Sequence, residues 1–327
     1  MIQKEERKLW LDFLRGFAML LVIWGHVAKT EHLFFVVTGS FKMPLFFAIT
    51  GYVFYCTSVK TFFQKLWTKI AIPWVVLSFV WVKVFFAFIT NQPEKISFYL
   101  YNFVSGTSLW FMPCFIIAEC IQYIIRKCVK TNFKQYLAML FVSLLGIVMS
   151  KYGIGRFAMF DVACISQAFM LFGYWFRNNE AILCENIKIN RLLLMLFIYA
   201  ALILISIKFY PGMAIDVHNN SYYNYMLCGL MTFISLLMLF LILQRINLQS
   251  YKLFRWIIFV GQNTLVFYIM HYYPRFVINR ILPVIIDSFE SLNGYIISFI
   301  FICVSMTFIT FAINKWFPFL VGKKQLL

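Results

Sequence analysis

The chain has 327 residues, of which 63% are hydrophobic and only 13% are charged, and its formal net charge is +17. Soluble domains are about 45–50% apolar and about 25% charged, and a folded domain buries only part of its apolar surface. The composition therefore excludes soluble globular, disordered, collagen-like and coiled-coil proteins. It predicts an all-α, polytopic membrane helix bundle that forms one integral-membrane domain over residues 1–327.

Ten apolar segments are long enough, or nearly long enough, to cross a bilayer, which takes about 20 helical residues. Leu, Ile, Val, Phe, Met and Ala dominate each of them. The predicted transmembrane helices cover residues 9–27, 38–56, 70–90, 109–125, 136–150, 158–176, 192–209, 223–243, 256–273 and 295–314.

Lysine and arginine are concentrated in alternate loops. Most lie at the N-terminus, in the loops after even-numbered predicted helices, and at the C-terminus, whereas the intervening loops carry few. Because basic residues mark the cytoplasmic loops of membrane proteins, this bias predicts that both termini are cytoplasmic. The positive charge thus follows from membrane topology, and we expect the lipid bilayer, not nucleic acid, as the partner.

The eight cysteines contain no Cys-x-x-Cys pair, and most lie in apolar segments. Cysteines in such segments are usually buried free thiols, whereas zinc sites and disulfide frameworks have characteristic spacings. We therefore expect no disulfide framework and no metal site.

The first predicted helix carries three ionisable residues, Asp12, Arg15 and His26. Each such group costs at least about 2.5–3.5 kcal/mol at the centre of a transmembrane helix, so it indicates a site, a pathway or a buried pair. Asp12 and Arg15 are neighbours on one helical face and predict an ion pair. Arg15 and His26 are eleven residues apart, so on a helix their side chains point within about 20° of the same direction, about 16 Å apart along the axis. We expect a cytoplasmic cation and an external imidazole to face one channel, although a histidine at a helix end is often only a hydrogen-bonded interfacial residue.

The ninth predicted helix ends on a second histidine, His271, at the same predicted depth as His26. Thr264 lies seven positions earlier and shares its face. The two imidazoles either frame a site or are both interfacial residues. Lys42 lies at the external end of the second predicted helix, where it either faces this site or snorkels to the interface. Trp110 begins the fourth predicted helix, a position typical of interfacial aromatic residues.

Several segments resemble the membrane acyltransferase-3 family, in the order in which that family has them. The run from Arg15 to His26 matches its Arg-x10-His signature, and residues 41–52 match its Met-Pro-Leu-Phe-Phe run, with Thr50 in place of the usual Ser. Residues 72–74 (Ile-Pro-Trp) follow a basic stretch, as in the family. Two more matches are Leu-Trp-Phe at 109–111 and Gly-Gln-Asn-Thr-Leu at 261–265, followed by His271.

The resemblance implies an enzyme of about ten spans in a bacterial plasma membrane. Members of the family move an acyl group, most often acetyl from cytoplasmic acetyl-CoA, to a hydroxyl of a sugar or glycolipid at the external face. This chain is most similar to the members that O-acetylate surface polysaccharides. A succinyl or longer acyl group, the acceptor sugar and the oligomeric state are left open by the sequence.

The resemblance and the spacing together suggest residue roles. His26 would be the base for the acceptor hydroxyl, or alternatively would carry the acyl group itself. Arg15, oriented by Asp12, would hold the phosphates or the pantetheine arm of acetyl-CoA. Lys65 and Lys69, on the predicted cytoplasmic side, would also contact the donor. The candidates for acceptor binding or oxyanion stabilisation are His271, Lys42, Asn263, Thr264 and Trp110.

Two other functions fit parts of the pattern. A proton- or ion-coupled transporter also places charges inside a helix bundle, but such proteins often show repeated halves with broken helices, and no repeat is evident here. A non-catalytic membrane protein would not need the histidines.

Overall fold

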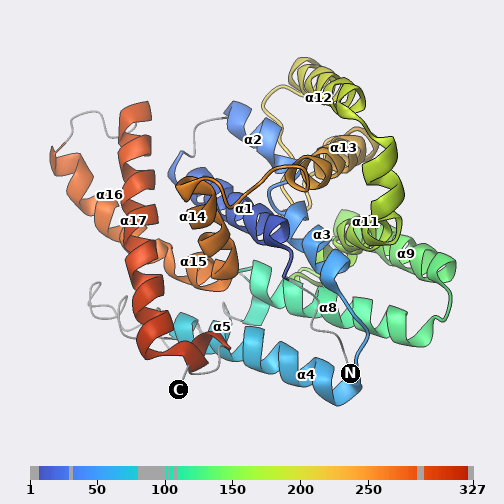
Figure 1. The fold of residues 1–327 in the computed structure, drawn as a ribbon, viewed down its shortest axis with the longest axis horizontal. Coiled ribbons are helices and arrows are strands. Elements are labelled where there is room, and N and C mark those ends of the chain that lie inside the picture. The colour runs from blue at the N-terminus through green and yellow to red at the C-terminus, as the bar shows by residue number, and fades with distance from the viewer. Residues whose placement is uncertain are drawn as a thin grey trace.

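The structure is a computed structural model that describes residues 7–28, 32–79, 101, 104–106, 109–285 and 291–322. Helices dominate these residues, as Figure 1 shows. Within the described ranges there is no β-strand, only an isolated bridge between Asp216 and Ser221. The predicted all-α class is therefore confirmed.

The helices are connected mostly by short turns. In chain order they are α1 (Leu9–Val27), α2 (His32–Gly39), α3 (Pro44–Val53), α4 (Val59–Leu66), α5 (Ile72–Phe79), α8 (Phe111–Cys128), α9 (Asn132–Lys151), α10 (Phe160–Ile165), α11 (Gln167–Asn186), α12 (Ile189–Phe209), α13 (Tyr225–Leu243), α14 (Lys252–Gln262), α15 (Thr264–Met270), α16 (Tyr272–Ile285) and α17 (Leu292–Trp316). A π-helix (Trp67–Ala71) joins α4 to α5, and short 3-10 helices (Phe157–Met159 and Pro318–Val321) precede α10 and follow α17.

Six helical segments are long and apolar enough to cross a membrane, and eight are if each of two bent helix pairs counts as one span. These eight coincide with eight of the ten predicted spans. The predicted span 109–125 forms α8, which is long enough but carries three charged residues, Glu119, Arg126 and Lys127. Of the predicted span 70–90, residues 80–90 lie outside the described part of the chain. The count of ten stays a prediction.

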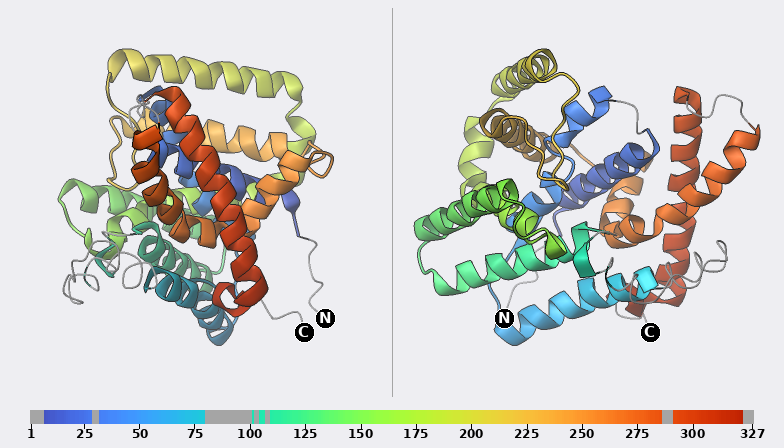
Figure 2. Two further views of the ribbon diagram at one scale, coloured as in Figure 1. Left: turned by 90° about the vertical axis from the view of Figure 1, so that its left-hand side faces the viewer. Right: turned by 180° about the vertical axis from the view of Figure 1, so that it is seen from behind.

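Helix α1 lies in the middle of the bundle, in contact with α2, α3, α13, α14, α15 and α17. In Figures 1 and 2, α12 and α13 lie at one edge and α16 and α17 at the opposite edge. Most of the buried side chains belong to one hydrophobic cluster that includes residues of α1 and its neighbours. Of the ionisable side chains on α1, Asp12 is therefore buried, whereas Arg15 and His26 are partly exposed.

Two helix pairs approach so closely that only glycine fits between them. A Cβ atom on Gly16 of α1 would lie 2.0 Å from the carbonyl oxygen of Ile257 in α14, and one on Gly261 would lie 1.7 Å from that of Asp12. Gly51 of α3 and Gly173 of α11 form an equivalent reciprocal pair. Close backbone approach through small residues is a common way to associate helices in membranes, where water does not drive packing.

Two helix breaks have local causes. Pro44 has no N–H to donate and occupies the first turn of α3, so the predicted helix 38–56 is divided into α2, a turn at residues 40–43, and α3. The predicted helix 256–273 bends by 75° between α14 and α15. At that bend Asn263 donates from Nδ2 to the Phe259 carbonyl (2.8 Å) and accepts at Oδ1 from Asn314 Nδ2 (2.9 Å).

Loops that the charge bias assigns to one side of the membrane lie together. Lys8 pairs with Glu180 at 3.0 Å, and Arg177 and Arg126 both donate to the carbonyl oxygen of Phe54, at 2.8 and 3.3 Å. This agrees with the predicted alternation of the spans. Which end faces the cytoplasm stays a prediction.

We expect Gly173→Ala to destabilise the fold, because a Cβ atom there would lie 1.8 Å from the Ala48 carbonyl oxygen. Overpacking of this kind typically costs about 1–3 kcal/mol, which would lower the melting temperature of the purified protein in detergent. Gly229→Ala in α13 is the matched control, since a Cβ atom at that position would have no atom within 4 Å. Equal melting temperatures for the two variants would contradict the close approach.

Candidate active site

Two cavities open along α1, one toward each end. The first, called here the histidine cavity, has a volume of about 740 Å³. It is lined by Val22, Gly25, His26, His32, Phe35, Gly39, Lys42, Met43, Leu109, Trp110, Ala214, Ile215, Asp216, Val217, His218, Tyr268 and Tyr272. The second, the arginine cavity, has a volume of about 580 Å³. It is lined by Arg7, Lys8, Leu11, Asp12, Arg15, Tyr52, Val53, Tyr55, Arg177 and Glu180.

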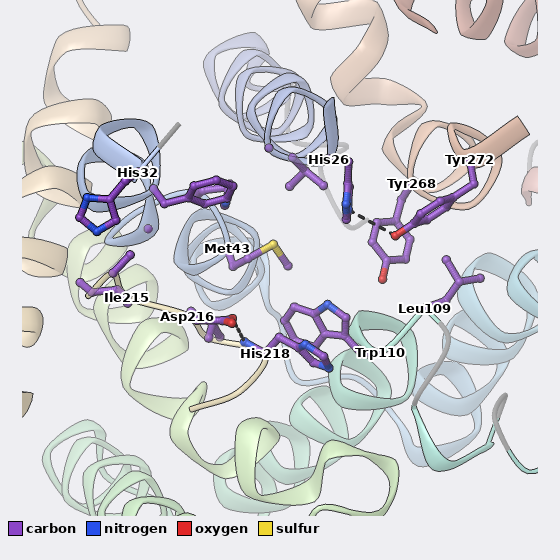
Figure 3. Close-up of a pocket in the computed structure, with 17 residues that line it drawn as sticks. His26, His32, Met43, Leu109, Trp110, Ile215, Asp216, His218, Tyr268 and Tyr272 are labelled. Atoms are coloured by element: carbon purple, nitrogen blue, oxygen red, sulfur yellow. Dashed lines mark hydrogen bonds between the residues drawn. The ribbon is translucent and has the colours of Figure 1, made fainter. Parts of the chain in front are cut away.

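Three of the four histidines of the chain line the histidine cavity (Figure 3), and the fourth stacks on one of them. His26, His32 and His218 line it, and His271 lies directly behind His26, with the two ring centroids 5.2 Å apart and the ring planes 28° apart. His26 is half-buried, whereas His271 is completely buried. A molecule in the cavity can therefore touch His26, whereas His271 contacts His26 from the buried side.

The backbone fixes the tautomer of His271. Its Nδ1 lies 3.0 Å from the carbonyl oxygen of Phe267 and 2.8 Å from that of Tyr268. Carbonyl oxygens only accept hydrogen bonds, so Nδ1 carries the proton and the neutral ring has its lone pair at Nε2. Nε2 is buried and has no hydrogen-bond partner among the described residues.

His26 is also held by Tyr272, the residue that follows the buried histidine. The Tyr272 hydroxyl lies 3.3 Å from His26 Nε2, drawn as a dashed line in Figure 3. The 75° bend before α15 and the start of α16 bring both partners to the end of α1. One imidazole with cavity access is thus oriented by a second imidazole and a phenol.

The opposite wall of the histidine cavity combines aromatic and polar groups. Trp110 stacks on His218 with centroids 5.0 Å apart and planes at 29°. Asp216 Oδ1 accepts a hydrogen bond from the His218 backbone N–H at 2.9 Å. Burial lowers the pKa of His218, although the Asp216 carboxylate opposes that shift. Lys42 adds a cation on the α1 side of the cavity, with Nζ 4.8 Å from the Phe35 ring centroid and close to Gly25.

Asp12 and its partners organise the arginine cavity. Its Oδ2 accepts from Arg7 Nε at 2.5 Å and from Gln262 Nε2 at 3.3 Å, while Arg15 Nη1 lies 3.6 Å from Oδ1. The Arg15 side chain is 30% exposed, toward the cavity that it lines. The predicted Asp12–Arg15 ion pair is therefore present, with Arg7 as the closer partner of Asp12.

The remaining wall of the arginine cavity is rigid. Lys8 donates to Tyr52 and pairs with Glu180, and the Tyr52 hydroxyl donates to Glu180 at 2.5 Å. Arg177 Nη1 donates to the backbone carbonyl of Tyr52 at 3.0 Å, and its guanidinium lies 4.5 Å from the Tyr55 ring centroid. Cationic and aromatic groups are thus fixed around one opening.

The sequence led us to expect that Arg15 and His26 face one open channel, but in the structure they do not. They line different cavities that have no lining residue in common. Ala18 and Met19 lie between them on α1, and both are completely buried. Both residues lie on one face of α1, as predicted, but the buried side chains between them separate that face into two sites.

Some of the predicted site residues lie elsewhere. Lys65 in α4 and Lys69 in the π-helix are exposed and line neither cavity. Asn263 and Thr264 also line neither: Thr264 Oγ1 donates to the Gly261 carbonyl at 2.6 Å, and Asn263 bonds to the Phe259 carbonyl and to Asn314 of α17. Neither cavity supports a contact of these four residues with donor or acceptor. Lys42 and Trp110 do line the histidine cavity.

Five residues with polar side chains in the histidine cavity were not indicated as site residues by the sequence pattern. His32, Asp216, His218, Tyr268 and Tyr272 all line it. One signal was available: Asp216-Val217-His218 interrupts the apolar composition in a loop on the predicted external side, where His26 also lies. Nothing in the spacing links that loop to α1, because the contact is made only in the folded bundle.

Comparison with protein families shows what this site belongs to. The sequence model of the acyltransferase-3 family, described as an acyltransferase domain, matches residues 8–315. The chain belongs to the acyltransferase-3 family. It is a membrane acyltransferase, so the transporter interpretation is not favoured. Comparison with curated proteins and with solved structures gave no match.

The cavities of this acyltransferase contain side chains for acid–base and electrostatic chemistry. Among the described residues, no group of three or more His, Cys, Asp or Glu side chains is placed to bind a metal ion. All eight cysteines are free, and none lines either cavity. The accessible imidazole of His26 is the best-placed candidate for a base.

Tyr272→Phe should lower the rate of acyl transfer by between about 2-fold and 10-fold, because a neutral hydrogen bond contributes about 0.5–1.5 kcal/mol. The measurement is the initial rate in purified membranes, normalised to the amount of protein. Tyr273→Phe is the matched control, since the neighbouring tyrosine lines neither cavity. An equal loss in both variants would argue against the contact with His26.

Proposed function

We propose that this acyltransferase takes an acetyl group from acetyl-CoA at the cytoplasmic side of a bacterial plasma membrane. It transfers the group to a hydroxyl of a surface polysaccharide or lipid-linked sugar at the external face. One observation carries the proposal: α1 presents a guanidinium to one cavity and an imidazole to another, with buried residues between them.

The arginine cavity has the chemistry of a donor site. Coenzyme A carries several phosphate charges, and guanidinium groups bind phosphate well because their planar N–H donors match its oxygen atoms. Arg15 offers its guanidinium to the cavity, and Arg177 holds the ring of Tyr55 at the same opening. Its volume of about 580 Å³ is within the usual range of small-molecule sites.

The separation of the cavities suits a donor with a long arm. Arg15 and His26 are separated by about 16 Å along the helix axis. Phosphates held near Arg15 would therefore require the extended pantetheine arm to reach His26. Met19 and Ala18 are both buried between the two groups, so the flexible Met19 side chain must move when the arm passes.

The transfer step needs one base and one site for developing negative charge. The acceptor oxygen attacks the thioester carbonyl carbon while the imidazole of His26 takes the hydroxyl proton. The carbonyl oxygen becomes an oxyanion, and the positive charge of Lys42 in the same cavity stabilises it. The carbon–sulfur bond then breaks, and the proton on His26 passes to the leaving thiolate. The products are an acetyl ester and the coenzyme A thiol.

His271 and Tyr272 support this step by acting on His26. The ring of His271 is held in the neutral Nδ1–H form by two carbonyl oxygens, so it adds no second cation beside His26. The Tyr272 hydroxyl orients the His26 ring. The neutral His271 ring favours an imidazolium on His26 in the transition state, and the Tyr272 contact fixes the direction of the His26 ring.

The histidine cavity suits a sugar as the acceptor. Its volume of about 740 Å³ can hold more than one sugar ring. Aromatic faces pack against the C–H faces of sugars, and Trp110 and Tyr268 supply such faces. His218, Asp216 and Lys42 supply hydrogen-bonding groups for hydroxyls.

His26→Gln should reduce the O-acetyl content of the surface glycan by at least about 100-fold, because general base catalysis typically contributes 100-fold to 10,000-fold. The glutamine side chain is polar and of similar size, so the protein should still accumulate in membranes, as measured by quantitative immunoblot. Undiminished O-acetylation in a variant present at the native level would refute the proposal.

Arg15→Ala should raise the KM for acetyl-CoA at least about tenfold, because hydrogen bonds to charged groups contribute about 1.5–3 kcal/mol. Arg15→Lys keeps the charge but not the planar donor group, so its KM should lie between those of the native protein and Arg15→Ala. The measurement is the rate of thiol release at varied acetyl-CoA. An unchanged KM in Arg15→Ala would exclude this donor site.

A further inference from the structure

The loop between α12 and α13 reaches into the histidine cavity as a closed hairpin. Asp216 N–H donates to the Ser221 carbonyl at 3.1 Å, and Ser221 N–H donates back to the Asp216 carbonyl at 2.9 Å. The Asp216 carboxylate accepts from the His218 backbone N–H and from Asn219 Nδ2, at 2.9 and 2.7 Å. We call residues 216–221 the loop hairpin. Its internal bonds fix its shape, but they do not fix its position in the cavity.

An ion pair outside the cavity holds the loop hairpin in position. Asp161 in α10 is completely buried, and its Oδ2 accepts from Arg156 Nη1 at 3.2 Å and from Asn220 Nδ2 at 2.7 Å. Arg156 Nη2 donates to the His218 carbonyl at 3.2 Å. The pair therefore binds the hairpin twice, at its backbone and at a side chain. Neither Arg156 nor Asp161 lines the histidine cavity.

Left-handed backbone conformations occur beside this ion pair. Ala158 and Met159, just before Asp161, have φ values of 54° and 58°, and Asn220 in the hairpin has a φ of 50°. Asn adopts the left-handed region readily, but for Ala and Met it is costly, and such conformations persist only where surrounding structure enforces them, often at functional sites. Burying a carboxylate is costly as well. The energetic costs of the left-handed residues and of the buried Asp161 carboxylate are explained if the hairpin must be held in one position.

The position matters because of what the hairpin presents. His218 stacks on Trp110 at 5.0 Å, and both line the cavity on the wall facing His26, Tyr268 and Tyr272 (Figure 3). Ile215, just before the hairpin, packs on Gly39, where a Cβ atom would lie 2.5 Å from the Ile215 carbonyl oxygen. The hairpin is thus held between α2 and the Arg156–Asp161 pair, with its polar groups toward the reacting imidazole.

We propose that the loop hairpin is the recognition element for the sugar acceptor, and that Arg156 and Asp161 are positioning residues that set acceptor affinity from outside the cavity. His218 and Asp216 bond hydroxyls of a pyranose ring that packs against Trp110. This inference rests on the proposed function, because it requires an acceptor that binds beside His26. The arginine cavity and its residues are not involved, so the effect must be specific to the acceptor.

The test separates acceptor affinity from donor affinity. The protein is purified in lipid nanodiscs, and initial rates are measured with labelled acetyl-CoA. The acceptor is surface polysaccharide from cells that express the chain, freed of O-acetyl groups by mild alkali. Two variants report on the proposal: His218→Ala removes a group that touches the acceptor, and Arg156→Lys keeps the charge beside Asp161 but loses the planar group that reaches Asp161 and the His218 carbonyl together.

We expect both variants to raise the KM for the polysaccharide at least tenfold and to change the KM for acetyl-CoA less than twofold. The matched controls are Met213→Ala, in the same loop but outside the cavity, and Arg280→Lys, an exposed arginine. Both controls should leave both constants within twofold of the native values.

Four outcomes would overturn the inference. An unchanged acceptor KM in the two variants would exclude the hairpin as the recognition element. A parallel change in both constants would indicate a general structural role for the Arg156–Asp161 pair. Failure of the native protein to acetylate the polysaccharide would overturn the proposed function and this inference with it. Loss of acetyl transfer in His26→Gln, together with native KM values in Arg156→Lys, would overturn this inference alone.

Discussion

The close approach of α1 and α14 is the constraint on which the rest of the structure depends. Gly16 and Gly261 let the two backbones meet with no side chain between them. This contact places Gln262 within 3.3 Å of Asp12, at the arginine cavity. The chain then bends by 75°, and α15 delivers His271 to the back of His26. One helix contact thus sets the geometry at both ends of α1.

Key polar groups beside the two cavities of this apolar bundle are held by nearby partners. An unpaired polar group buried in an apolar environment costs several kcal/mol, and an unpaired charge costs more. Asp12 accepts from Arg7 and Gln262. His271 Nδ1 donates to the backbone carbonyl oxygens of Phe267 and Tyr268 in α15. Partners of this kind stabilise single positions without adding net charge. They also fix side-chain orientation, which general acid–base chemistry requires.

Sequence reasoning reached part of the candidate site and missed part for physical reasons. His26 and His271 were indicated because an ionisable group in a transmembrane helix is rare and costly. Asn263 and Thr264 were indicated as acceptor-binding residues but line neither cavity, and at the helix break both side chains donate to backbone carbonyls of α14. Lys65 and Lys69 follow the charge bias of the loops, but that bias reports topology and does not report contact with a ligand.

The sequence by itself determined that this protein is an all-helical membrane protein, that α1 carries a cation and an imidazole on one face, and which family it belongs to. These properties follow from composition, helical periodicity and residue order, which are local along the chain. Only the tertiary structure decided that Met19 and Ala18 divide the face into two cavities, and that the loop hairpin joins His26 at one of them. Both depend on packing between segments far apart in the chain, and helical periodicity contains no information about which distant segments meet.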